Sequence, residues 1–268
     1  PSNVRIGDII QAARIKYGPQ HNTSLRNFVL ANTDLVGTLA TPFAPIVNTA
    51  VGLKPVRYAM DKVMAIDHRR IFPKYAHGTF TAWYRKHAAA AQAAYPKQVA
   101  YFHGCYVNYN NPQLGKDLLR VMNALGYGVQ LLDKEKCCGV ALISNGLHKQ
   151  ARRQAQTNLH AIRTAVNDRG MDVITTSSTC TFTLRDEYPH LLRLENDDVR
   201  DRIELATRYL YRLLKEQGKE LKFKDTTPLR VAYHTPCHME KMGWGYYSIE
   251  LLRMIPGVEV TVLDSQCC

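Results

Sequence analysis

One cysteine-containing unit occurs twice in this sequence, and this repeat constrains the fold more than any other feature. Residues 98–105 (Gln-Val-Ala-Tyr-Phe-His-Gly-Cys) resemble residues 230–237 (Arg-Val-Ala-Tyr-His-Thr-Pro-Cys). Further along, residues 117–120 resemble residues 250–253, and residues 128–133 resemble residues 257–264. Each copy then reaches a cysteine pair, Cys137–Cys138 or Cys267–Cys268. Such self-similarity predicts two copies of one strand–Cys–helix–strand–Cys–Cys unit.

The repeat lies in a region where strand and helix patterns alternate. Apolar runs at residues 98–102, 129–132 and 172–176 predict strands, and residues 112–125 and 147–167 read as helices between them. A further helix that ends at Gly218 is predicted, because Val199, Ile203, Ala206, Leu210 and Leu213 share one helical face over residues 199–213. This alternation favours a parallel α/β fold. We expect residues 98–138 and 230–268 to superpose about a pseudo-twofold axis.

The first ninety-six residues are expected to be mainly helical. One helix is predicted from Val4 to Tyr17, closed by Gly18–Pro19. A second begins at Lys54–Pro55, and the apolar stripe that contains Val56 and Val63 most simply packs on a core. The predicted organisation is therefore a helical region (1–96), a first cysteine-rich unit (97–228) and a truncated second unit (229–268). A start without methionine and an end on a cysteine pair suggest a fragment.

The cysteines follow the predicted strands, and parallel strands gather their carboxyl ends at one edge of a sheet. Thiolates are soft ligands that suit iron–sulfur clusters and zinc. The first unit supplies four, which we expect to converge: Cys105, Cys137, Cys138 and Cys180. The second unit supplies Cys237, Cys267 and Cys268, an incomplete set. A strained disulfide between Cys137 and Cys138 is the minor alternative.

Other chemistry-bearing residues are less specific. His103, His234 and His238 lie beside the cysteines, where they could complete a zinc site, orient a ligand or simply pack near a polar loop. Nucleophilic Cys–His catalysis would need one activated thiol rather than a repeated set. Asp186 and Glu187 form a carboxylate pair that is expected to be solvated.

Charge and hydropathy divide the N-terminal region into two contrasting stretches. The net charge is +12, but no nucleic-acid-reading module is present, so no nucleic-acid partner is expected. Residues 35–53 carry no charge, although Pro42 and Pro45 interrupt them, which predicts a buried or interfacial pair of short helices rather than a membrane span. The basic excess is densest at residues 54–86. A solvated face, a membrane surface and a partner subunit all remain open as explanations.

The cysteine pattern resembles a known family. A cysteine, a later Cys–Cys–Gly and a still later Cys-x-x-Cys form the pattern of the cysteine-rich CCG family, which includes the B subunit of heterodisulfide reductase and several respiratory subunits. Within it, the C subunits of anaerobic glycerol-3-phosphate dehydrogenases are similar along essentially the whole chain. The matching stretches are residues 24–30, 41–49, 131–139, 176–182 and 234–244.

The resemblance implies an electron-transfer subunit rather than an enzyme in its own right. It would be peripheral to the cytoplasmic face of the inner membrane and serve the flavin-containing catalytic A and B subunits. Electrons from glycerol 3-phosphate would pass through iron–sulfur clusters, of the 4Fe–4S or a non-cubane type, to the quinone pool. The chain has neither a Walker-type phosphate loop nor a Gly-x-Gly-x-x-Gly turn, so flavin or nicotinamide chemistry must belong to a partner. The alternatives are a zinc-bound structural anchor or a redox component of another dehydrogenase.

Three departures from the family pattern matter. The ferredoxin-like segment that begins family members is absent, and the second unit stops at Cys268. In the first unit, Ser177 occupies the position of the first cysteine of Cys-x-x-Cys, which leaves only Cys180. A five-cysteine non-cubane cluster is therefore not expected there, whereas four thiolates could hold a simpler cluster or a structural zinc.

Overall fold

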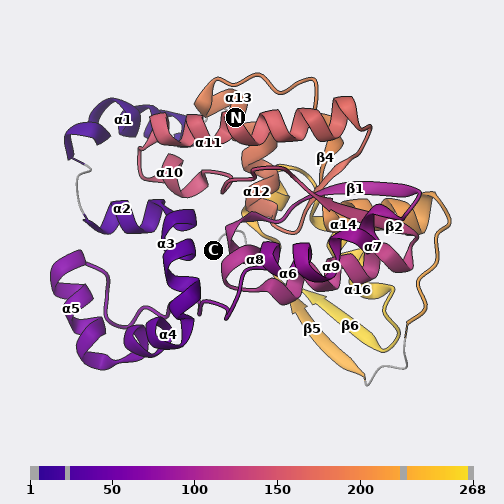
Figure 1. The fold of residues 1–268 in the computed structure, drawn as a ribbon, viewed down its shortest axis with the longest axis horizontal. Coiled ribbons are helices and arrows are strands. Elements are labelled where there is room, and N and C mark those ends of the chain that lie inside the picture. The colour runs from indigo at the N-terminus through magenta and orange to yellow at the C-terminus, as the bar shows by residue number, and fades with distance from the viewer. Residues whose placement is uncertain (1–5, 22–24, 224–227, 265–268) are drawn as a thin grey trace.

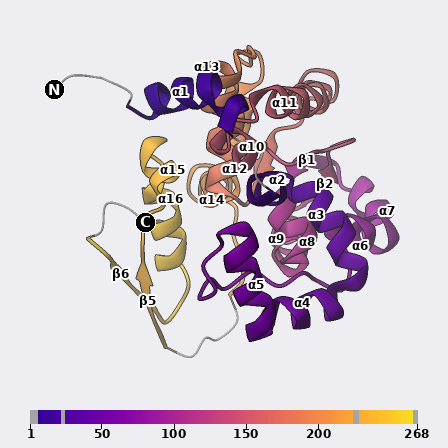
Figure 2. The same ribbon diagram turned by 90° about the vertical axis from the view of Figure 1, so that its left-hand side faces the viewer.

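The computed structural model describes residues 6–21, 25–223 and 228–264, so Cys267 and Cys268 lie outside the described residues. A helical part lies beside an α/β part (Figure 1, Figure 2). The helical part consists of α1 (Ile6–His21), α2 (Leu25–Ala31), α3 (Thr33–Ala40), the 3₁₀ turn η1 (Thr41–Phe43), α4 (Ala44–Gly52), α5 (Lys54–Met64), α6 (Phe80–His87) and α7 (Ala89–Ala93).

The uncharged stretch forms two helices that the turn η1 separates. The helix α4 leaves η1 in a different direction from α3 (Figure 1). By length and composition alone, the 20 residues Thr33–Gly52 are apolar enough to cross a membrane: an 18-residue window within them has a mean hydropathy of 1.3, and 22% of that window is buried. The two predicted short helices are present, and their buried or interfacial location stays a prediction.

A four-stranded parallel sheet forms the centre of the α/β part, in the order β2-β1-β3-β4. Its strands are β1 (Lys97–Phe102), β2 (Tyr127–Leu131), β3 (Val173–Thr175) and β4 (Ile203–Leu205). The helical segments between and after them are α8 (Gly104–Tyr109), α9 (Pro112–Ala124), α10 (Val140–Ser144), α11 (His148–Arg163), η2 (Thr164–Asp168), α12 (Ser178–Phe182), η3 (Thr183–Glu187), α13 (Tyr188–Leu192), η4 (Arg200–Arg202), α14 (Ala206–Tyr211) and η5 (Arg212–Glu216). The predicted parallel α/β architecture is confirmed.

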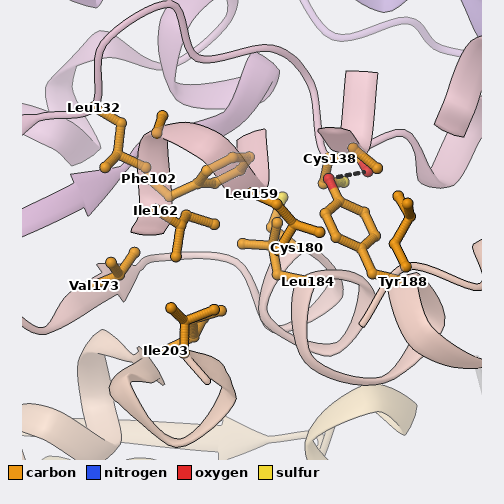
Figure 3. Close-up of a cluster of buried hydrophobic side chains, with 14 of the residues drawn as sticks. Phe102, Leu132, Cys138, Leu159, Ile162, Val173, Cys180, Leu184, Tyr188 and Ile203 are labelled. Atoms are coloured by element: carbon orange, nitrogen blue, oxygen red, sulfur yellow. Dashed lines mark hydrogen bonds between the residues drawn. The ribbon is translucent and has the colours of Figure 1, made fainter. Parts of the chain in front are cut away.

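Helices cover both faces of this sheet, because successive strand side chains point to opposite sides. Phe102 of β1 packs with Leu159 and Ile162 of α11 on one face (Figure 3). Its neighbour Tyr101 packs with Met122 of α9 on the other face. Burial on both faces is typical of parallel sheets. The helices packed on the two faces hold the strands in place, and with them the loops that follow the strand ends.

The second unit forms a separate two-stranded parallel sheet from β5 (Leu229–Tyr233) and β6 (Val258–Val262). Between them lie α15 (Cys237–Lys241) and α16 (Gly245–Arg253), so the element order repeats that of β1, α8, α9 and β2. The parallel pairing excludes an antiparallel hairpin here. The pseudo-twofold relation between the two units stays a prediction.

Three local predictions were wrong. The predicted helix at residues 199–213 contains the strand β4, and a helix begins only at Ala206. The first helix runs through Gly18–Pro19 to His21 instead of ending before them. No residue of α5 is buried, and the side chain of Val63 is 73% exposed, so its apolar stripe does not pack on a core.

Gly128 provides a test of how tightly α7 packs against β2. A Cβ atom at this position would collide with the backbone oxygen of Gln92, which cannot move as a flexible side chain could. We expect Gly128→Ala to lower the free energy of unfolding by about 1–3 kcal/mol, as overpacking does. Urea denaturation measures the change. Gly78→Ala, where the new Cβ atom meets nothing within 4 Å, is the control, and equal effects of both variants would contradict this packing.

Candidate metal centre

Four cysteines lie at the carboxyl edge of the parallel sheet. Cys105 follows β1 at the start of α8, and Cys137 and Cys138 lie in the loop between β2 and α10. Cys180 follows β3 in α12. Because the three strands are parallel, these loops meet at the same edge. The structure thus brings the four predicted cysteines of the first unit together.

Their sulfur atoms form a row. The Sγ atoms of Cys105 and Cys137 are 3.7 Å apart. The Cys138 thiol hydrogen-bonds with the thiols of both Cys137 and Cys180. A Cβ atom on Gly104 would lie 3.3 Å from the Cys180 sulfur, so the row turns back toward the Cys105 loop. Cys105 is half-buried and the other three are buried.

The row favours one thiolate flanked by protonated thiols. The pKa of Cys137 is lowered, chiefly because its sulfur accepts hydrogen bonds from the thiols of Cys105 and Cys138. The pKa values of those two neighbours are raised, first by donating these bonds and then by burial. Metals bind the thiolate form of cysteine. A cation bound at the row would therefore displace the thiol protons and reduce the repulsion between the resulting thiolates.

A buried polar group beside the row also fits a bound cofactor. The hydroxyl of Thr33, the first residue of α3, lies beside the thiols of Cys105 and Cys137. It is within hydrogen-bonding reach of both thiols, which are the kind of partner that a buried hydroxyl requires. Thiolates or cluster sulfides are acceptors that this hydroxyl could serve, so the residues present fit an iron–sulfur group.

Hydrogen bonds from α11 and α13 fix the loop that carries the cysteine pair. Asn158 is fully buried and contacts the loop twice: its Nδ2 donates to the Cys137 carbonyl (3.1 Å) and its Oδ1 accepts from the Lys136 amide (2.8 Å). Tyr188 donates its hydroxyl proton to the Cys138 carbonyl (3.0 Å; Figure 3) and accepts from Asn158 (3.1 Å). The backbone of the cysteine pair is therefore held without using the sulfur atoms.

Two carboxylates hold the same loops from the other side. The Asp34 carboxylate, on α3, accepts a hydrogen bond of 2.6 Å from the Cys137 amide. Glu135, with a side chain only 4% exposed, accepts bonds from the amides of Gly104 (2.8 Å) and His103 (3.2 Å). Burial raises the pKa of Glu135 well above its usual range. Glu135 thus ties the loop after β2 to the loop after β1.

The histidines beside the cysteines contact protein groups. The Nε2 atom of His103 lies 3.3 Å from the Thr81 hydroxyl, and its Nδ1 atom lies 3.0 Å from the Gly104 carbonyl oxygen. His238 stacks on Phe182 with ring centroids 4.8 Å apart, and its Nδ1 atom lies 3.1 Å from the Thr179 hydroxyl. These contacts favour packing over metal ligation for both.

Of the second predicted set, the structure describes Cys237 only. It begins α15, which packs against α12, the helix that carries Cys180. Cys267 and Cys268 lie outside the described residues. The second site therefore stays a prediction.

The carboxylate pair predicted to be solvated is instead engaged by neighbours. Asp186 forms an ion pair with Arg200 at 2.7 Å, and its side chain is only 17% exposed. Glu187 accepts a hydrogen bond of 2.7 Å from the Thr183 hydroxyl. Both residues belong to η3, directly after the Cys180 helix, so they stabilise that segment.

Asp34 should give the metal-free protein a characteristic pH dependence. Burial, then the negative charge of Cys137, raises its pKa from 3.8 to about 6. The folded state therefore binds the proton more tightly than the unfolded state, and stability is lost as the pH rises from about 4 to about 6. We expect Asp34→Asn to be more stable than the parent at pH 7, by at most about 3 kcal/mol, with no difference below pH 4. Urea denaturation at each pH measures this, and parallel pH profiles for the two proteins would refute it.

Sequence comparison with known proteins identifies the family of this chain. Residues 99–185 match the CCG family, described as a cysteine-rich domain. The C subunit of anaerobic glycerol-3-phosphate dehydrogenase from Escherichia coli K12 is 65% identical over the whole chain, which spans 67% of that protein. The B subunit of the CoM/CoB fumarate reductase from Methanothermobacter marburgensis is 30% identical over 64% of the chain and 32% of its own length. The D subunit of dihydromethanophenazine:CoB–CoM heterodisulfide reductase from Methanosarcina barkeri is 28% identical over 63% of the chain and 42% of its own length. The chain belongs to the family of anaerobic glycerol-3-phosphate dehydrogenase C subunits, whose cysteine-rich CCG domain it contains.

Proposed function

We propose that this chain is the iron–sulfur electron-transfer subunit of an anaerobic sn-glycerol-3-phosphate dehydrogenase complex. The observation that carries the proposal is the row of four thiols at one sheet edge, within a chain of this C-subunit family. Repeated cysteines in buried, hydrogen-bonded loops are typical of cofactor ligands and not of scattered core residues.

Cys105, Cys137, Cys138 and Cys180 would hold the first cluster. When bound, such a cluster accepts and donates single electrons. The protein's contribution is to orient the loops through Asn158 and Tyr188. Cys237, Cys267 and Cys268 would contribute to a second cluster in the unit of residues 229–268.

The row shape supports an iron–sulfur cluster over zinc. Tetrahedral zinc brings all four sulfur atoms within roughly 4 Å of one another, because each lies about 2.3 Å from the ion. Among the described residues, the one group of three or more ligand-type atoms mutually within 4.8 Å is Asp61, Asp67 and His68, far along the chain from the cysteines. An iron–sulfur cluster distributes its thiolates over more than one iron atom, so it does not need all four sulfur atoms within about 4 Å of one another.

The flavin-containing A and B subunits are the proposed partners. The oxidation of glycerol 3-phosphate would occur on them, since this sequence contains no phosphate-binding loop or dinucleotide-binding turn. The chain would then carry the electrons onward to the quinone pool. Under this proposal, the alcohol is oxidised on the catalytic subunits, and this chain carries the electrons from there to the quinone.

The helices α3, α4 and α5 support a location on the cytoplasmic face of the inner membrane. Leu39, Phe43 and Ile46 are 64%, 60% and 70% exposed, which is unusual for large apolar side chains in succession. The neighbouring segment is basic: Lys54, Arg57, Lys62, Arg69 and Arg70. Apolar side chains would enter the lipid interface while these cations meet anionic headgroups.

Removal of single thiols tests the cluster. We expect Cys105→Ser, Cys137→Ser, Cys138→Ser and Cys180→Ser each to lower the iron content of the anaerobically prepared full-length protein by about one cluster, because every ligand is needed. Iron and sulfide analysis with visible absorption measures the loss. Ser178→Ala, beside the site but without a thiol, is the control. Zinc at full occupancy in the parent, with no iron lost from the variants, would establish the structural-anchor alternative.

Vesicle sedimentation tests membrane contact. The full-length protein without its partners should bind phosphatidylglycerol vesicles and not phosphatidylcholine vesicles. Changing Lys54, Arg57, Lys62, Arg69 and Arg70 to Gln should weaken binding at least about tenfold, since each cation contributes roughly 1 kcal/mol near the surface. Changing five cations outside this region to Gln is the matched control: Lys116, Lys149, Arg153, Lys219 and Lys222. Absence of binding to either lipid would favour docking on the catalytic subunits.

A further inference from the structure

A cavity of about 390 Å³ opens directly beside the thiol row. Cys105 and Cys137, the two neighbouring thiols at one end of the row, line it together with Tyr84, Arg85, Tyr109 and Lys134. Cys138 and Cys180 lie behind them and do not line the cavity. One end of the thiol row therefore borders this cavity directly.

The cavity also borders the apolar helix pair. Asp34 of α3 lines it, and the next residue, Leu35, is 45% exposed. Tyr109 joins the cavity wall to α3, because a Cβ atom on Gly37 would lie 2.5 Å from its ring and its hydroxyl lies 3.1 Å from the Thr38 hydroxyl. The cavity therefore adjoins α3, the first helix of the apolar pair.

The charged side chains that line the cavity differ in whether they already bond to other protein groups. The carboxylates of Asp34 and Glu135 accept backbone amide bonds within the loops. Arg85 and Lys134 are exposed and form no ion pair within the described part of the chain. The free donors at the mouth suit carbonyl oxygens, and the rings of Tyr84 and Tyr109 offer flat apolar surface.

We propose that this cavity binds the head ring of a lipid-soluble quinone, with Arg85 and Lys134 as hydrogen-bond donors to its oxygens. The inference rests on the proposed electron-transfer function and adds the place where the acceptor binds. A volume near 390 Å³ is within the range of roughly 300–1,000 Å³ found for small-molecule pockets. A protein acceptor would need a flat docking face, whereas a water-soluble acceptor would make no use of the adjoining apolar helices.

The reaction balances with groups already named. Oxidation of the alcohol carbon of glycerol 3-phosphate to a ketone releases two electrons and two protons on the catalytic subunits. The quinone would take up these two electrons one at a time, through the cluster that the four cysteines would hold, and two protons from water at the open mouth of the cavity, and become a quinol. No further oxidant or reductant is required.

The complete dehydrogenase, with menadione as the quinone, tests the cavity. Arg85→Gln and Lys134→Gln should each raise the KM for menadione about tenfold, as loss of a charged donor does. Calorimetric titration of the isolated full-length protein should show a Kd raised to the same extent. Lys86→Gln is the matched control, because Lys86 neighbours Arg85 on α6, is exposed and does not line the cavity.

A second measurement separates this proposal from the one it rests on. Adding glycerol 3-phosphate without quinone should bleach the iron–sulfur absorbance equally in the parent and the variants. If bleaching fails in the parent, the electron-transfer function is wrong, while the menadione Kd still reports on the cavity. If bleaching occurs but Arg85→Gln and Lys134→Gln leave both KM and Kd unchanged, the quinone does not bind here.

Discussion

The three hydrogen bonds of Asn158 are the constraint on which the cysteine site depends. This fully buried side chain joins the Lys136 amide, the Cys137 carbonyl and the Tyr188 hydroxyl. Backbone groups that are buried without partners cost free energy, and here one amide side chain satisfies two of them. Tyr188 satisfies a third at Cys138. The loop therefore keeps its shape through α11 and α13 whatever the sulfur atoms bind.

The convergence of the cysteines could be predicted because strand order and thiol position are both local in the sequence. Each cysteine follows a strand, and parallel strands must end at a common edge. The supporting residues could not be predicted in this way. Asp34 lies 103 residues before its partner Cys137, and neither Asn158 nor Tyr188 belongs to a recognisable motif. Only the packing of α3, α11 and α13 on the loop reveals them.

The failed predictions also have physical causes. Ile203 lies four residues after Val199 and three before Ala206, which fits helical spacing, but pairing with β3 decides the conformation. The strand position also buries Glu204, whose carboxylate contacts Arg208 and Arg212 from the helical segment that follows. The apolar stripe of α5 had the right period for a helix, but periodicity does not say whether protein or something else covers the apolar face.

The two units contact each other through two pairs of helices, α14 with α16 and α12 with α15, and the second pair carries cysteines. The helix α15 packs against α12, and His238 lies against Phe182 and Thr179 at this contact. Cys180 and Cys237 are thus on neighbouring helices although 57 residues separate them in sequence. The contact therefore brings one cysteine-bearing helix of each unit side by side.

Ser177 shows how helix capping limits what the first site can bind. Its hydroxyl accepts a hydrogen bond from the Cys180 amide (3.3 Å) and so begins α12, and its own amide donates to the Thr175 hydroxyl (3.0 Å). A side chain turned back to cap its own helix cannot also reach a metal, and a thiol is a weaker acceptor than a hydroxyl. A cysteine in place of Ser177 would add a fifth sulfur donor beside Cys180. It would also weaken the cap of α12, the segment that presents Cys180.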